Sequence, residues 1–259
     1  MSTRQAEPPP GDLLMLRRTA LLPALTALVL AVTAGCTAAD EVAGDSKPSA
    51  TATARPADNT GAPGGAAKDG SPLADAIGEL TVKPEHTGSY DRDDFKHWNS
   101  GADPDDGCDT RQELLLAEAV KQPTKGEGCK LTGGEWLSYY DEVTVTDAGD
   151  LDVDHIVPLE EANSSGAHAW TPARREAYAN DLQAPRSLVA VTAKTNRSKG
   201  KRDVAEWLPP AENALCTYLE DWTGTKLRWT LTVDQAEHDT LTRLAKDCPD
   251  ATVDYEPAP

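Results

Sequence analysis

Asp154 and His155 are neighbours in the string Asp152-Val-Asp154-His155-Ile-Val-Pro158, and together they offer two kinds of catalytic chemistry. An imidazole accepts a proton near neutral pH, and a carboxylate holds a hard divalent cation. Hydrolysis of a phosphodiester uses both, because a base activates water while a cation neutralises charge on the phosphate. Alternating apolar residues predict a strand over 151–157 that Pro158 ends. Neighbouring side chains of a regular strand leave on opposite faces. If Asp154 and His155 act on one phosphate, we therefore expect a bend or twist of the strand at these residues.

A second set of polar residues follows further along the chain. Ser187–Thr192 is typical of a short buried strand, and Ala193–Lys199 is predicted to be helical. Asn196, in that helix, offers a neutral amide oxygen of the kind that Mg²⁺ accepts as a ligand. A dense basic run surrounds it, made of Lys194, Arg197, Lys199, Lys201 and Arg202. On a chain with a formal net charge of −18, such a local basic stripe is what phosphate contact requires.

Asp-His-Ile-Val-Pro, a short strand and Asn-Arg-Ser-Lys-Gly together resemble the ββα-metal core of HNH endonucleases, including the GmrSD-type family and the HNH domain of CRISPR effector nucleases. Tyr90–Trp98, Gly107–Gln112 and Glu206–Pro210 resemble secreted actinobacterial members, so the resemblance covers residues 90–248. It implies an α+β fold with a ββα-metal (His-Me finger) core wrapped by additional helices. It also implies an endonuclease acting on DNA, with RNA as the alternative substrate, at low sequence specificity.

The same resemblance assigns roles to individual residues. His155 becomes the general base, while Asp154 and Asn196 become the protein ligands of one Mg²⁺ (or Mn²⁺) ion. The expected contacts with nucleic acid are Lys194, Arg197, Lys199, Lys201 and Arg202, among which Lys199 also stands as a catalytic phosphate contact.

One position departs from the family pattern. Many HNH motifs place an Asn just before the second strand, where it braces the loop that holds the base, whereas this chain has Arg186-Ser187. Ser187, or Asn180 upstream, is expected to take over that role. Asp152 is expected to be an exposed carboxylate, or one that supports the ligands without touching the metal; a further metal ligand is the alternative.

Two other classes of function compete with the nuclease. A non-catalytic surface lipoprotein could use a nuclease-like fold as a binding module, but a decayed site would be expected to lose Asp154, His155 or Asn196. A metalloprotease would require a motif such as H-E-x-x-H, which the sequence lacks. The sequence therefore favours the nuclease.

The beginning of the chain predicts export. Arg17-Arg18 precede the apolar run Thr19–Gly35, which stops at Cys36, and these features are typical of a secretory signal over residues 1–35. Thr33-Ala-Gly-Cys36 resembles a lipobox, so Cys36 is expected to be lipidated and to anchor the protein to the outer face of the cell membrane. Ordinary cleavage nearby, giving a secreted protein, is the alternative. The export route, general or twin-arginine, stays open.

The remaining cysteines are Cys108, Cys129, Cys216 and Cys248, an even number without a C-x-x-C pair. In an exported protein this favours two disulfides over a zinc site. Three pairings are possible, and we favour the sequence-local one, Cys108–Cys129 with Cys216–Cys248. Each closure is expected to contribute about 3 kcal/mol to stability.

The mature chain is expected to contain a tether and one folded domain. Residues 36–72 consist mostly of small and polar residues, too few of them apolar to offset the entropy of ordering, so they are expected to be disordered. Residues 73–259 carry all six Trp and all six Tyr and are expected to form a monomeric nuclease domain. Its further predicted elements are helices over 109–120, 171–178, 215–219 and 233–244, and strand-like residues over 136–146.

Overall fold

The computed structural model describes residues 68–259; the predicted signal peptide, Cys36 and residues 36–67 of the predicted tether lie outside the described residues. Residues 68–259 form a mixed helix and strand fold whose sheets are two-stranded and antiparallel. The strands are β1 (Lys68–Pro72), β2 (Thr124–Lys125), β3 (Leu131–Thr132), β4 (Trp136–Ser138), β5 (Val143–Val145), β6 (Leu151–His155), β7 (Leu188–Thr192) and β8 (Thr252–Tyr255). The helices are α1 (Leu73–Glu79), α2 (Thr110–Ala117), α3 (Leu159–Ser164), α4 (Pro172–Ala179), α5 (Ala193–Lys199), α6 (Leu215–Trp229) and α7 (Gln235–Leu244).

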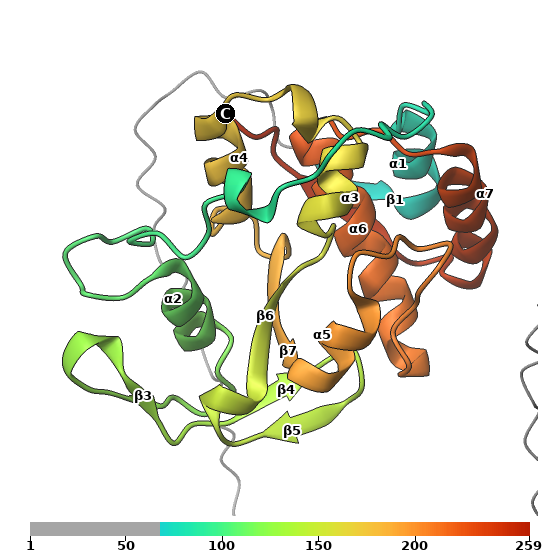
Figure 1. The fold of residues 1–259 in the computed structure, drawn as a ribbon. Helices are drawn as coiled ribbons and strands as arrows, with labels where there is room; N and C mark the ends of the chain where they lie inside the picture. The colour runs from blue at the N-terminus through green and yellow to red at the C-terminus, as the bar shows by residue number, and fades with distance from the viewer. Residues whose placement is uncertain (1–67) are drawn as a thin grey trace, which may run out of the picture. The chain divides into compact units, whose positions relative to one another are not determined.

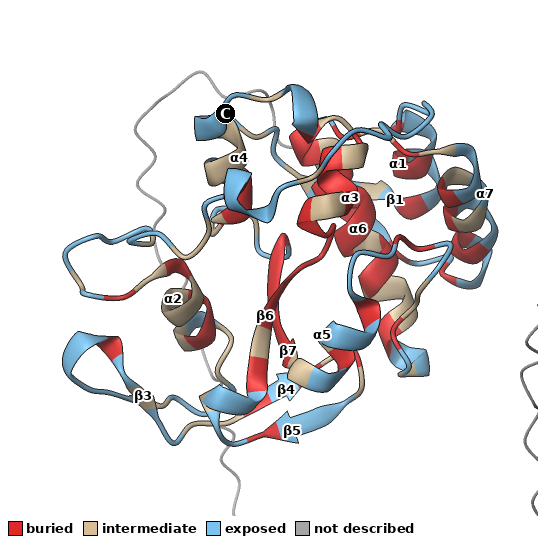
Figure 2. Cartoon of the chain, in the orientation of Figure 1, coloured by how far each residue is buried: buried red, intermediate tan, exposed pale blue. Residues whose placement is uncertain are grey.

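The antiparallel pair β6–β7, followed directly by α5, lies between two hydrophobic cores (Figure 1). Leu151 and Val153 of β6 pack with α2 and the β4–β5 hairpin in the smaller core. Val189 and Val191 of β7 face the larger core, which α1, α3, α4, α6 and α7 build. Figure 2 shows both strands largely buried, as expected of a pair covered on two faces. This pair is therefore a fixed platform for whatever side chains it carries.

Capping residues explain where several helices begin and end. Asp109 and Gln112 form a reciprocal capping box at the start of α2. Thr171 caps α4, whose first residue is Pro172. Thr192 caps α5, and Gly200, with φ of 60°, ends it. The predicted helices over 171–178 and 193–199 are thereby confirmed to within one residue.

Several predicted elements have different bounds; the helix predicted over 109–120, for example, is the shorter α2, Thr110–Ala117. The strand-like residues 136–146 form two strands, β4 and β5, joined by a turn in which Glu142 has φ of 55°. The helix predicted over 215–219 continues to Trp229 as α6. β1 begins at Lys68 and pairs with β8, so the folded domain starts before the predicted tether boundary at residue 72. Within residues 68–259 no helix has the length and apolarity needed to cross a membrane.

Two disulfides each join neighbouring segments of the chain. Cys108–Cys129 ties the N-terminal end of α2 to the β2–β3 hairpin, and Cys216–Cys248 ties α6 to the turn after α7. Both are the predicted pairings. Because each cross-link restricts the unfolded chain, each should stabilise the domain in an oxidising compartment.

Glu118, at the end of α2, should make stability depend on pH. Its Oε2 accepts a hydrogen bond from the Ala190 main-chain N–H at 2.7 Å, and burial raises its pKa from 4.5 to about 7. The folded state therefore holds a proton that the unfolded state releases, and stability falls as pH rises from 4.5 to about 7.

Glu118→Gln keeps an acceptor for Ala190 without the charge, so the variant should gain about 1–2 kcal/mol over wild type above pH 7. Below pH 4.5 the two proteins should be equally stable. Urea unfolding from pH 4 to 8 measures the difference. Glu127→Gln, at an exposed glutamate, is the matched control and should follow the wild-type profile.

Candidate active site

Asp154 and His155 are the last two residues of β6, and the structure keeps the strand regular there. Asp154 pairs with Val189 and His155 with Leu188, without a shift of register. Their side chains accordingly leave β6 on opposite faces. The bend that we expected at this point is absent, so the two groups can meet a common substrate only around the end of the strand.

The Asp154 carboxylate lies on the face of β6 that α5 covers. Its Oδ2 accepts hydrogen bonds from the Tyr140 hydroxyl at 2.7 Å and from the Lys199 ammonium group at 2.5 Å. Burial raises the pKa of Asp154, and the charge of Lys199 opposes that rise. Asp154 Oδ1 accepts no hydrogen bond from the described residues, so one carboxylate oxygen keeps its acceptor capacity.

The His155 imidazole lies on the other face, in an aromatic environment. Its Nε2 lies 3.0 Å from the Ala179 carbonyl oxygen, which can only accept, so Nε2 carries the proton and Nδ1 keeps its lone pair. The rings of Trp98 and Tyr178 lie near-parallel to the imidazole, at centroid distances of 5.6 and 6.2 Å. Burial lowers the pKa of His155 to about 3, so the ring is neutral at physiological pH.

Asn196 faces Asp152 rather than Asp154. Its Nδ2 donates to Asp152 Oδ2 over 3.3 Å, and the Arg197 guanidinium group lies 3.7 Å from the same oxygen. Asn196 Oδ1 accepts no hydrogen bond from the described residues. Asp152 is thus a partly exposed carboxylate in contact with the Asn196 amide.

Lys199 is placed differently from its expected role. Its side chain is 0% exposed, and its ammonium group donates to Asp154 Oδ2 and to the carbonyl oxygens of His155 and Ile156. All three donor positions are used, which leaves none for the phosphate contact expected of Lys199. It instead ties α5 to the end of β6. The other predicted phosphate contacts, Lys194, Arg197, Lys201 and Arg202, are exposed, although Arg197 is close to Asp152 and Lys201 pairs with Glu160.

Ser187 and Asn180, the two candidates for bracing the loop that holds the base, make different contacts. Ser187 donates to Asp181, away from His155. Asn180 accepts from the Asn99 main-chain N–H and donates to the Lys96 carbonyl oxygen, and thereby holds the segment that carries Trp98. The imidazole itself is held by the Ala179 carbonyl, a main-chain group that residue types could not reveal.

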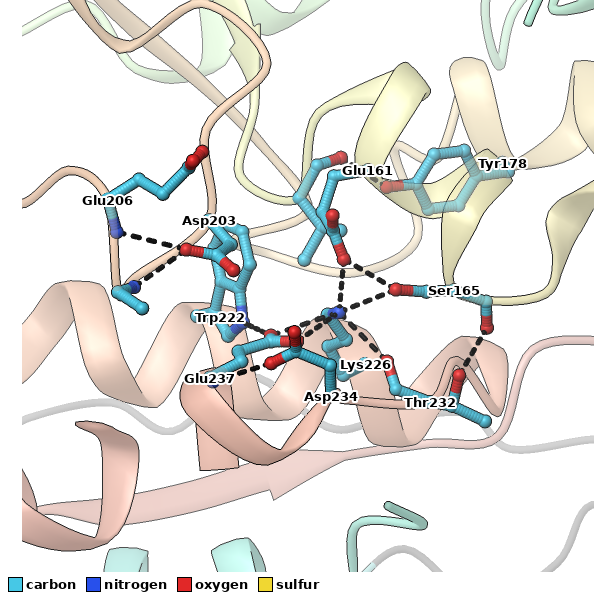
Figure 3. Close-up of polar contacts among 12 residues, drawn as sticks. Glu161, Ser165, Tyr178, Asp203, Glu206, Trp222, Lys226, Thr232, Asp234 and Glu237 are labelled. Carbon is cyan, nitrogen blue, oxygen red and sulfur yellow. Dashed lines mark hydrogen bonds and ion pairs between the residues drawn. The ribbon is translucent and has the colours of Figure 1, made fainter. Parts of the chain in front are cut away.

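A separate group of buried charges lies between α3, α6 and α7 (Figure 3). Oxygens of Asp203, Asp234 and Glu237 lie within 4.8 Å of one another. Glu237 also accepts from Trp222 and from Lys226, whose ammonium group lies 2.7 Å from Glu161. Lys226 thus supplies positive charge at this group, and its contacts join three helices. We assign it a structural role.

Comparison with known proteins places the chain in a family. Residues 102–244, more than half of the chain, match the family "GmrSD restriction endonucleases, C-terminal domain". The chain belongs to this family. The GmrSD-type family was the resemblance predicted from the sequence, and the matched span includes β6, β7 and α5 with Asp154, His155 and Asn196.

One similar protein is described as secreted. "Uncharacterized secreted protein" of Arthroderma benhamiae is 39% identical over 170 residues, which cover 65% of this chain and 81% of that protein. No solved structure matches the chain. The site of this GmrSD C-terminal domain must therefore be argued from its own residues.

Proposed function

We propose that this GmrSD-family domain is an exported, metal-dependent endonuclease of the HNH type that hydrolyses phosphodiester bonds in DNA, with RNA as the alternative substrate. The observation that carries the proposal is the adjacency of Asp154 and His155 at the end of β6, paired with β7 and followed by a helix bearing Asn196. The proposal includes low sequence specificity and a monomeric state.

The residues at the proposed metal site fit a hard divalent cation in their chemistry. Asp154 Oδ1 and Asn196 Oδ1 are oxygens that no described residue engages, and carboxylate and amide oxygens are the ligands that Mg²⁺ and Mn²⁺ prefer. Such an ion would neutralise charge on the phosphate and on the leaving oxygen. The Asp152 contact with Nδ2 keeps the Asn196 amide from rotating freely.

His155 is proposed as the general base. It is neutral, and its Nε2–H is committed to Ala179, so Nδ1 is the atom that takes a proton from the attacking water. Because the strand ends at His155, a phosphate at that end can reach both faces of β6. The exposed Lys194, Arg197, Lys201 and Arg202 are proposed to contact flanking phosphates, which predicts that affinity falls with added salt.

Export is supported by the two disulfides and by the secreted relative. We propose that the protein works outside the cell, either released or held at the membrane by a lipid on Cys36. A nuclease there would meet free nucleic acid without access to the cell's own chromosome.

Plasmid digestion by the purified exported protein tests the function. Nicking and linearisation are expected with Mg²⁺ or Mn²⁺ and should stop with chelator, because the cation balances charge that develops in the reaction. Asp154→Asn should require more metal for half-maximal cleavage, while Asp150→Asn, at an exposed carboxylate in the same chain segment, should not. Binding of DNA without cleavage under every metal would instead support the binding-module alternative.

A further inference from the structure

Trp98 is held in an unusual conformation directly on the proposed base. Its φ is 60°, in the left-handed region that a residue with a β-carbon rarely adopts. Its indole stacks on the His155 ring with 18° between the planes. A strained backbone conformation persists only when the surrounding structure holds it in place. The segment around Trp98 should therefore be anchored by specific contacts.

The anchors of Trp98 and of His155 are consecutive residues. Asn180 accepts from the Asn99 N–H at 3.0 Å and from the Thr110 hydroxyl at 2.8 Å, and it donates to the Lys96 carbonyl oxygen at 2.8 Å. The preceding residue, Ala179, bonds the imidazole through its carbonyl oxygen at 3.0 Å. One dipeptide at the end of α4 thus fixes both the ring and the segment stacked on it.

Tyr178 completes the aromatic contact from the same helix. Its ring lies at 23° to the imidazole, and its hydroxyl donates to the Val157 carbonyl oxygen, which holds the ring in place. The His97 ring meets the imidazole edge-on at 6.4 Å and is itself bonded to the Phe95 carbonyl oxygen. The one hydrogen bond to Ala179 leaves the imidazole able to pivot about that bond, whereas stacked rings restrict its plane.

We propose that Trp98 is a positioning residue, which with Tyr178 fixes the plane of the His155 imidazole so that Nδ1 faces the reacting water. The proposal rests on the proposed function of His155. Misplacement of a reacting group by about 1 Å can lower a rate by about 10²-fold. The effect of losing Trp98 should therefore fall on kcat, while KM changes little, because Trp98 acts through the imidazole.

The test compares Trp98→Ala and Trp98→Phe in the full exported protein. Trp98→Ala should lower kcat by about 10²-fold at nearly unchanged KM, and Trp98→Phe, which keeps a ring, should recover most of the loss. The side-chain proton resonances of His155, which ring currents displace, should move in Trp98→Ala and move less in Trp98→Phe. Thermal melts under oxidising conditions establish that each variant is folded.

Two results would overturn the proposal: His155 resonances that stay in place in Trp98→Ala, or a kcat that Trp98→Phe fails to recover although both variants are folded. Failure of the proposed function gives a different pattern. In that case the wild-type protein cleaves nothing, while the resonances still report whether Trp98 orients the ring.

Discussion

His155→Ala will lower the rate of plasmid cleavage by about 10²–10⁴-fold, the usual contribution of general-base catalysis. No other imidazole in residues 68–259 combines a position at the end of β6 with an Nδ1 left open by its main-chain bond. KM should change little, because the ring acts on water rather than on the bulk of the substrate. Single-turnover cleavage at saturating metal measures the loss directly.

His168→Ala is the matched control for that experiment. His168 also bonds a main-chain carbonyl, that of Asn163, but it is exposed and stacks on His86. The His168→Ala variant should cleave plasmid DNA at the wild-type rate. Equal cleavage by His155→Ala and His168→Ala, with both proteins folded, would remove His155 from the mechanism and with it the proposed base.

Local sequence signals predicted the platform of the site well. Thr192 and Gly200 bound α5, and the apolar residues of β7 match a strand buried on both faces, whereas β6 ends at His155, before Pro158, which precedes α3. Each of these signals acts within a few residues, because capping and strand burial depend on neighbouring side chains. For that reason the order strand, strand, helix could be predicted without the structure.

Contacts between distant segments could not be predicted in the same way. Lys199 was expected to contact phosphate, but its side chain is buried against Asp154, a partner that belongs to another element. The opposite faces of Asp154 and His155 follow from a register that continues to the last residue of β6. The pairing of β1 with β8 joins the two ends of the domain, and no local pattern marks such a pairing.

Substitution of Lys226 is expected to lower the stability of the fold strongly. Its ammonium group is fully buried and donates to Glu161 at 2.7 Å, Glu237 at 3.0 Å and the Ser165 hydroxyl at 2.8 Å, all within one network (Figure 3). Burial, mainly, raises the pKa of Glu237 from 4.5 to about 7, even though the charge of Lys226 opposes that rise. Without the lysine, two buried carboxyl groups lose their counter-ion.

Lys226→Met, which keeps most of the side-chain volume, should therefore cost about 3–5 kcal/mol in the free energy of unfolding. The loss should be larger at pH 8 than at pH 5, because Glu237 without its counter-ion binds a proton more tightly in the folded state than in the unfolded state, so stability falls as pH rises. Lys201→Met is the control: Lys201 pairs with Glu160 at 2.8 Å but is 68% exposed, so its loss should leave the free energy of unfolding close to the wild-type value. Urea unfolding measures the free energy of unfolding of both variants. Equal losses would mean that the buried Lys226 network stabilises the fold no more than the exposed Lys201–Glu160 pair does. A loss confined to Lys226→Met would show that α3, α6 and α7 are joined by this one ammonium group.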